Sequence, residues 1–119
     1  MFCYNNLVNE ETNMLETKIY IGLNDADLKT QKFETTRYTS LLKRVCMSYH
    51  LPFSFSIAEG GYFHDDGTYT QETSLILSLI DADRSTVEEM AKDLCVFFNQ
   101  ESILITETEV NSYFIRESL

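Results

Sequence analysis

The hydrophobic pattern of this chain switches between two periods, and this switching limits the folds that it can adopt. Alternation of apolar and polar residues predicts strands, and spacings of three and four residues predict helices. The expected strands are residues 17–23, 53–58, 70–81 and 102–115, and the expected helices are residues 34–50 and 85–98. The resulting order β-α-β-β-α-β predicts a ferredoxin-like α+β fold, with a four-stranded antiparallel sheet and two helices on one face.

Each expected helix carries a single apolar stripe. In the first helix the stripe includes Leu41, Leu42 and Val45, and Pro52 prevents the helix from continuing. A capping box that begins at Ser85 is expected to start the second helix. One stripe covers one face of the sheet, so the opposite face is left open to water, a ligand or a partner. We expect this open face to carry Tyr20, Ile76 and Ile80.

Glycine positions refine the strand pattern. Gly60 and Gly61 interrupt the second strand, which predicts either a β-bulge or a close approach to the backbone. Asp66 and Gly67 form a hairpin signal, because glycine tolerates the positive φ that such turns require.

With 119 residues, the chain is long enough for one domain. We assign residues 1–15 to a loose N-terminal arm and residues 16–119 to a single α+β domain.

The formal net charge of −10 limits the class of partner. A nucleic-acid-binding surface needs a basic patch, and an anionic membrane likewise attracts basic segments, so we expect neither partner. An acidic surface favours basic partners, or serves solubility alone. The three cysteines, Cys3, Cys46 and Cys95, are odd in number and widely spaced, which indicates free thiols and a cytoplasmic location. We expect a core role for Cys46 and Cys95.

Several short motifs resemble a family of small bacterial proteins known only as a domain of unknown function. Residues 17–23, TKIYIGL, are similar to the family's opening TELYFGL, and FNQESIL at residues 98–104 is similar to its FGQESVL. Between them, Gly61-Tyr62, Asp66-Gly67 and Glu72-Thr73-Ser74 match its Gly-x-Trp, Asp-Gly and Glu-x-Ser, with Tyr62 in place of Trp. The resemblance covers residues 16–115. It supports the fold, and it brings no activity or cofactor.

Candidate binding residues gather in the second half of the chain. The hairpin residues His64, Asp65 and Asp66 with Glu72 suggest a metal site or acid–base chemistry, or merely a turn. Gln100 and Glu101 follow the second helix, where Glu72 and Ser74 would reach the same polar cluster. The predicted binding residues are Tyr20, Tyr62, His64, Glu72, Ile76, Ile80, Gln100 and Glu101. We assign no catalytic residue, metal ligand or cofactor.

Two functions are compatible with these features. The first is a non-catalytic, acidic protein-binding module that associates with itself or with a protein partner, such as a small inhibitor of a basic, nucleic-acid-handling protein. Its acidic surface would consist of Asp81, Asp83, Glu88, Glu89 and Asp93. The alternative is a small-molecule-binding protein or enzyme with an aromatic-lined cavity in a ferredoxin-like dimer. That cavity would be lined by Tyr20, Phe55, Tyr62, Tyr113 and Phe114.

Overall fold

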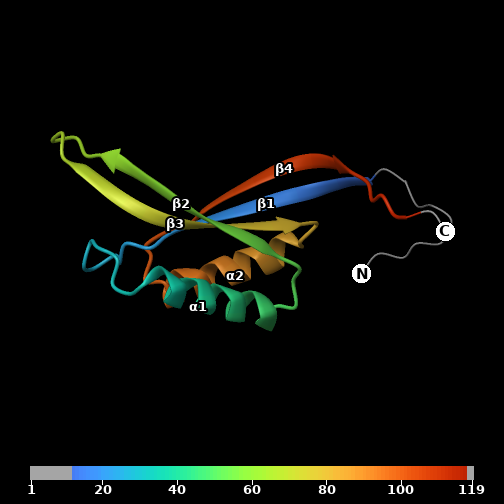
Figure 1. Cartoon of the computed structure of the whole chain (residues 1–119), viewed down its shortest axis with the longest axis horizontal. Coiled ribbons are helices and arrows are strands. Elements are labelled where there is room, and N and C mark those ends of the chain that lie inside the picture. The colour runs from blue at the N-terminus through green and yellow to red at the C-terminus, as the bar shows by residue number, and fades with distance from the viewer. Residues whose placement is uncertain (1–11, 118–119) are drawn as a thin grey trace.

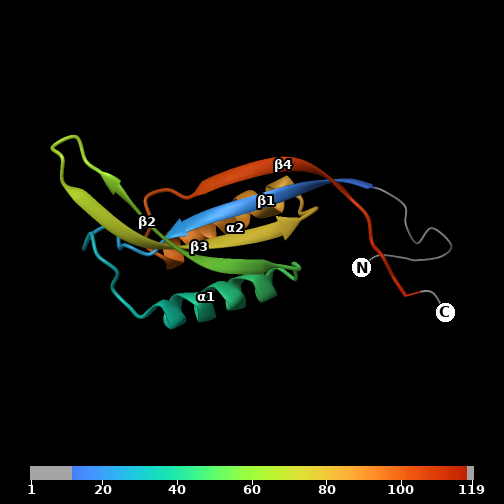
Figure 2. The same cartoon turned by 45° about the horizontal axis from the view of Figure 1, so that its top comes forward.

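The computed structural model describes residues 12–117. Its elements are β1 (Thr12–Gly22), α1 (Thr35–Ser48), β2 (Ser54–Phe63), β3 (Tyr69–Ile80), α2 (Arg84–Phe97) and β4 (Leu104–Ser112). The strands form one antiparallel sheet in the order β2-β3-β1-β4. Both helices lie on the same face of this sheet (Figures 1 and 2). The βαββαβ order and this strand arrangement confirm the predicted ferredoxin-like fold.

The core lies between the helices and the two central strands. Alternate residues of β1 and β3 are fully buried, among them Ile19, Ile21 and Leu77. The helix stripes meet them, with Leu42 from α1 and Leu94 from α2 in the same cluster. The period-two and helical patterns therefore face each other as predicted. Residues with the opposite parity on β1 and β3 lie on the open face.

The first strand begins earlier than expected. β1 starts at Thr12, and Thr12 pairs with Ser112 of β4. Residues 12–15, which we had assigned to the loose arm, are thus part of the sheet. Backbone hydrogen bonds to an edge strand need no apolar alternation, which explains why the pattern does not reveal this extension. Residues 1–11 of the expected arm lie outside the described residues.

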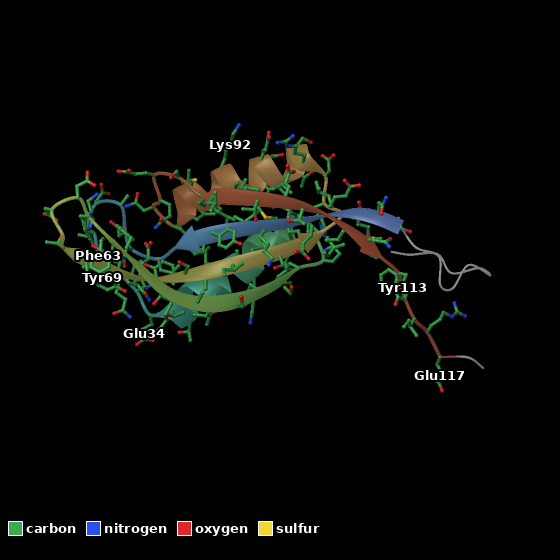
Figure 3. All side chains as sticks on the ribbon, turned by 90° about the horizontal axis from the view of Figure 1, so that it is seen from above. Glu34, Phe63, Tyr69, Lys92, Tyr113 and Glu117 are labelled. Carbon is green, nitrogen blue, oxygen red and sulfur yellow. The ribbon has the colours of Figure 1, made fainter. Side chains whose placement is uncertain are left out.

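The glycine pair in β2 marks a close approach and not a bulge. The pairing of β2 with β3 runs without interruption from Ser54 to Phe63. A Cβ atom on Gly61 would collide with the hydroxyl of Tyr69, whereas Gly60 has open space around it. Tyr69 also contacts Phe63, with ring centroids 5.1 Å apart (Figure 3). Gly61 therefore leaves room for an aromatic side chain to lie across the hairpin.

The N-cap residue of the second helix lies two residues earlier than the sequence suggests. Asp83, not Ser85, is the N-cap residue of α2, and its carboxylate accepts hydrogen bonds from the Thr86 backbone N–H and the Ser85 hydroxyl. The Ser85 hydrogen bond is the main cause that lowers the pKa of the Asp83 carboxyl. The predicted capping box at Ser85 is therefore wrong, because an aspartate two residues earlier performs this function.

A hydrogen bond from the Tyr49 hydroxyl to the Asp93 carboxylate joins the end of α1 to α2. This bond, with desolvation and the negative charge of Asp93, raises the pKa of Tyr49 to about 12. Because the folded-state pKa exceeds the reference value of 10.0, the stabilisation is complete below pH 10 and is lost as the pH rises towards 12. Burial raises the pKa of the Cys46 thiol to about 11, which fits a core role.

Replacing Tyr49 with Phe should lower Tm by roughly 5 °C at pH 8, the scale expected for one lost hydrogen bond in a small domain. Thermal unfolding followed by circular dichroism measures this change. The difference from the unmodified protein should shrink between pH 10 and pH 12. Tyr113, an exposed tyrosine beyond β4, provides the control, and Tyr113→Phe should leave Tm unchanged. A pH-independent difference would contradict the assignment to this hydrogen bond.

Candidate functional site

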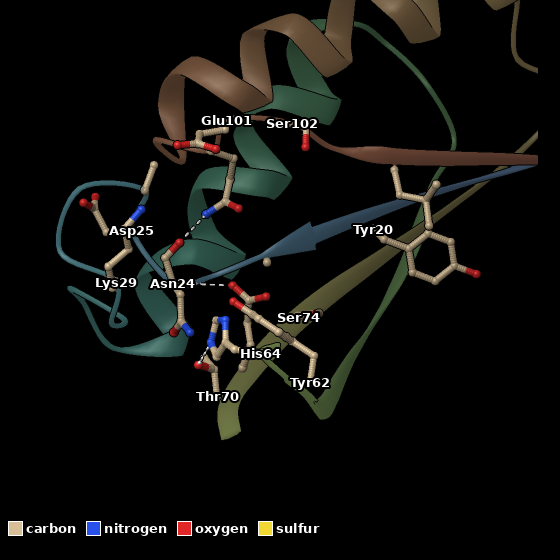
Figure 4. Close-up of a pocket in the computed structure, with 15 residues that line it drawn as sticks. Tyr20, Asn24, Asp25, Lys29, Tyr62, His64, Thr70, Ser74, Glu101 and Ser102 are labelled. Atoms are coloured by element: carbon tan, nitrogen blue, oxygen red, sulfur yellow. Dashed lines mark hydrogen bonds between the residues drawn. The ribbon is translucent and has the colours of Figure 1, made fainter. Parts of the chain in front are cut away.

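A cleft of about 680 Å³ opens beside the end of β1, on the face of the sheet away from the helices. It is formed by the ends of β1 and β4, the segment that follows β1, and the β2–β3 hairpin (Figure 4). Six of the eight predicted binding residues line it: Tyr20, Tyr62, His64, Glu72, Gln100 and Glu101. Ser74 lines the same cleft, so the predicted cluster of Glu72 and Ser74 with Gln100 is present.

Strand register explains why these residues meet. β3 continues beyond the end of β1, since Gly22 pairs with Ser74 and the residues of β3 before Ser74 have no partner in β1. Tyr62 on β2 pairs with Thr70, and Gly60 pairs with Glu72. Residues of one parity on these strands share one face. The hairpin thus carries its polar and aromatic residues past the end of β1, where they form one wall of the cleft.

The Glu72 carboxylate is held at the junction between the hairpin and β1. The backbone N–H of Asn24 donates a hydrogen bond to Glu72 Oε2 over 3.0 Å. Gly22 provides the space beside it, since a Cβ atom at this position would lie 2.5 Å from Glu72 Oε2. A backbone donor and a missing side chain therefore fix the position of one carboxylate in the cleft.

The segment after β1 is attached to two other elements. Gln100 Nε2 donates a 2.7 Å hydrogen bond to the Asn24 carbonyl, and Asn24 Nδ2 donates to the Gln71 carbonyl over 3.1 Å. The first of these bonds appears in Figure 4 beside the bond to Glu72. Asn24 therefore links the α2–β4 junction to β3, and Gln100 stabilises the residue that holds Glu72.

Asp25 organises the turn that closes this end of the cleft. Its Oδ2 accepts hydrogen bonds from the backbone N–H groups of Asp27 and Leu28, each over 3.0 Å. Its Oδ1 accepts one from Asn99 Nδ2 over 2.9 Å, and this bond is the main cause that lowers the pKa of the carboxyl. Asp25 therefore remains ionised well below neutral pH. It contributes negative charge to the cleft while it holds the turn.

The β2–β3 hairpin contributes an aromatic and imidazole pair. The rings of Tyr62 and His64 meet edge to face with centroids 5.1 Å apart, and His64 Nε2 lies 2.7 Å from Thr70 Oγ1. Asp66 instead serves the turn, because its carboxylate accepts hydrogen bonds from the backbone and the hydroxyl of Thr68. Among residues 12–117, no three His, Cys, Asp or Glu side chains are grouped so as to hold a metal ion.

The charges of the cleft are unequal. Three carboxylates, on Asp25, Glu72 and Glu101, line it together with the single ammonium group of Lys29. Such a surface attracts a positively charged ligand and disfavours one with several phosphate groups. Tyr20 and Tyr62 add aromatic surface, which also attracts cations when a ring face is presented. The cleft is thus suited to a small cation with an apolar or aromatic part.

The remaining predicted residues lie elsewhere. Ile76 pairs with Tyr20 across the open face, next to the cleft, whereas Ile80 lies further along β3 and is 46% exposed. Phe55 packs against the core, and Tyr113 lies beyond β4 at the opposite end of the molecule from the hairpin (Figure 3). Neither residue lines the cleft that Tyr20 and Tyr62 line, and the expected aromatic-lined cavity in a dimer stays a prediction.

The acidic surface is used partly within the domain. Asp83 caps α2, Asp93 binds Tyr49, and Glu88 lies 3.8 Å from Arg84. Asp81 and Glu89 are exposed, and a binding role for this surface stays a prediction. No described helix is long and apolar enough to cross a membrane.

The sequence prediction did not include the part of the site that the end of β1 and the turn after it contribute. Gly22, Asn24, Asp25 and Lys29 all line the cleft, and none of them is among the predicted binding residues. One signal was available, because an Asn-Asp pair directly after a buried strand is typical of a side-chain-stabilised turn. This turn contacts Glu72, Gln100 and Asn99, which are more than 45 residues away in the sequence. No local pattern indicates these contacts.

Comparisons with known proteins give structural neighbours only. No protein-family model matches the sequence, and no curated protein matches it significantly. A phage SAM lyase in complex with S-methyl-5'-thioadenosine is similar in structure, with a TM-score of 0.62, 17% identity, and coverage of 84% of this chain and 89% of that chain. The apo state of a phage SAM lyase has a TM-score of 0.62 and 15% identity, with coverage of 99% and 100%. A nitrogen regulatory PII-like protein from Thiomonas intermedia K12, bound to ADP, AMP and bicarbonate, has a TM-score of 0.47 and 10% identity, with coverage of 87% and 98%.

Proposed function

We propose that the cleft binds S-adenosylmethionine (SAM) or a close cationic analogue, and that the protein is a small-molecule-binding protein or enzyme. The observation that carries this proposal is the Glu72 carboxylate, held by the Asn24 N–H in an acidic cleft that also presents Tyr20 and Tyr62. SAM combines a positively charged sulfonium with an aromatic base. A fixed carboxylate and aromatic rings provide complementary partners for both parts.

The size and charge of the site agree with this ligand class. The volume of about 680 Å³ falls within the range of roughly 300–1,000 Å³ that is usual for small-molecule sites. The excess of carboxylates favours a nucleoside with a cationic sulfur over a nucleotide with several phosphates. Fold alone does not determine function, and it is the side chains of this cleft that favour a cationic ligand.

The structural neighbour suggests a reaction to test. A lyase that converts SAM to S-methyl-5'-thioadenosine breaks the bond between sulfur and the four-carbon amino acid chain. The sulfur keeps the electron pair and leaves as a neutral thioether, while an oxygen of the ligand's own carboxylate bonds to the carbon that the sulfur leaves and closes a lactone. The reaction therefore needs no oxidant, reductant or second substrate. The similarity to a phage SAM lyase bound to this thioether supports the assay, and the cleft supplies a place for the substrate.

The test compares three ligands by isothermal titration calorimetry and then assays turnover by chromatography. We expect SAM to bind at least tenfold more tightly than S-adenosylhomocysteine, which has no sulfonium charge, because charged contacts contribute about 1.5–3 kcal/mol. S-methyl-5'-thioadenosine should bind, and its release from SAM would establish the lyase reaction. Equal affinity for SAM and S-adenosylhomocysteine, or no binding of SAM at millimolar concentration, would contradict the proposal.

A protein-binding role on the acidic side of α2 is the second candidate. One observation favours it: Val96 and Phe97 are exposed at the end of α2, and Phe97 lies four and eight residues after Asp93 and Glu89, on the same side of the helix. An apolar patch beside carboxylates is suited to a basic protein. If this surface is used, association should weaken as salt increases, and Phe97→Ser should abolish it without changing SAM binding.

A further inference from the structure

The chemical character of the cleft changes along its length. At one end, Tyr20 lies between the register partners Ile76 and Leu104 and gives an apolar, aromatic surface. Glu72 lies near the junction of β1 with the hairpin, where it accepts the Asn24 hydrogen bond. At the other end, the turn after β1 contributes Lys29 (Figure 4). An aromatic region, a carboxylate and an ammonium group thus follow one another.

We propose that Lys29 binds the carboxylate of a zwitterionic ligand, so that the cleft selects SAM by its intact amino-acid end. This inference rests on the proposed function and adds the orientation of the ligand. The adenosine part would lie towards Tyr20, the sulfonium near Glu72, and the amino-acid carboxylate at Lys29. Glu72 and Lys29 are opposite in charge to the sulfonium and the carboxylate that they would meet.

The backbone of Lys29 is fixed by the turn. Its N–H donates a 2.8 Å hydrogen bond to the Asp25 carbonyl, and the Asp25 N–H donates to the Thr30 carbonyl over 2.9 Å. Lys29 adopts a left-handed conformation with φ of 65°, which is uncommon for a residue other than glycine. The Asp25 carboxylate holds the intervening N–H groups of Asp27 and Leu28. The position from which the Lys29 side chain extends is therefore well defined.

The ammonium group of Lys29 is available to a ligand. Within residues 12–117, the ion pairs of 4.0 Å or less involve Lys18 and Arg84, so Lys29 is not committed to a carboxylate of the protein. It is also the only cationic Lys or Arg side chain among the residues that line the described cleft. A ligand carboxylate in this acidic site would therefore have Lys29 as its one cationic partner, and a ligand without a carboxylate would leave Lys29 unpaired.

A cycle of two ligands and two variants tests the inference. SAM and decarboxylated SAM differ only in the carboxylate, and each is titrated against the unmodified protein, Lys29→Met and Lys29→Arg. We expect Lys29→Met to weaken SAM binding about tenfold or more and to leave binding of decarboxylated SAM unchanged. Lys29→Arg should retain most of the SAM affinity. Lys32→Met is the matched control, since Lys32 lies outside the cleft beside the Phe33 ring.

The outcomes separate this inference from the proposed function. An equal loss for both ligands in Lys29→Met, or no loss for SAM, would overturn the role of Lys29 while SAM binding by the unmodified protein still stands. No binding of either ligand by the unmodified protein would overturn the proposed function itself. Thermal unfolding of each variant identifies a folding defect, and Lys29→Arg then decides the question because it keeps the charge.

Discussion

Glu72→Gln should weaken SAM binding by at least tenfold while leaving the fold intact. The substitution removes the negative charge but keeps an oxygen that accepts the Asn24 N–H, whose bond to Glu72 Oε2 is 3.0 Å long. It also keeps the shape that fills the space beside Gly22. A hydrogen bond or contact with a charged group contributes about 1.5–3 kcal/mol, which corresponds to roughly 10- to 100-fold in affinity. Calorimetric titration measures the change directly.

The control for this experiment is an exposed carboxylate of the same sheet. Glu109 of β4 pairs with Leu15 and lies outside the cleft, so Glu109→Gln removes the same charge from the protein without changing the site. A similar loss in both variants would mean that SAM responds only to the net charge of −10. S-adenosylhomocysteine, which carries no sulfonium, should bind the unmodified protein and Glu72→Gln with similar affinity.

The fold could be predicted because its information is local. The period of the apolar residues indicates each strand and helix. The burial of Ile19, Leu77 and Leu94 follows from that period alone. A detail that depends on one competing residue was missed, since Asp83 and not Ser85 is the N-cap residue of α2. For the glycine pair, the close approach is the predicted alternative that the structure shows, at Gly61 beside the side chain of Tyr69.

The site could be predicted where it lies on a strand, in the hairpin or directly after a helix. Tyr62 and Glu72 share a face because their parity on β2 and β3 is fixed by the hairpin, and Gln100 follows directly from the end of α2. The turn formed by Asn24 and Asp25 could not be placed in the same way. Its position depends on hydrogen bonds to Glu72 and Asn99. These residues are far away in sequence, and they come close to the turn only when the sheet has formed.

Gly22→Ala should reduce SAM binding nearly as much as Glu72→Gln, although it changes no charge. The added methyl group would lie 2.5 Å from Glu72 Oε2 and 2.6 Å from its carboxyl carbon, so the carboxylate must move away from the Asn24 N–H. The displaced atoms form the flexible end of a side chain, so we expect only a small change in stability, measured by urea unfolding. Alanine also favours folding by about 0.4–1 kcal/mol through the unfolded chain, which offsets part of any strain.

Gly60→Ala and a double variant make this prediction decisive. Gly60 pairs with Glu72 across the hairpin, but a Cβ atom there meets no atom within 4 Å, so Gly60→Ala should leave SAM affinity unchanged. If Gly22 acts only by making room for the Glu72 carboxylate, Gly22→Ala combined with Glu72→Gln should bind SAM no more weakly than Glu72→Gln alone. Losses that add in the double variant would mean that Gly22 contributes to the cleft by another route, such as direct contact between its backbone and the ligand.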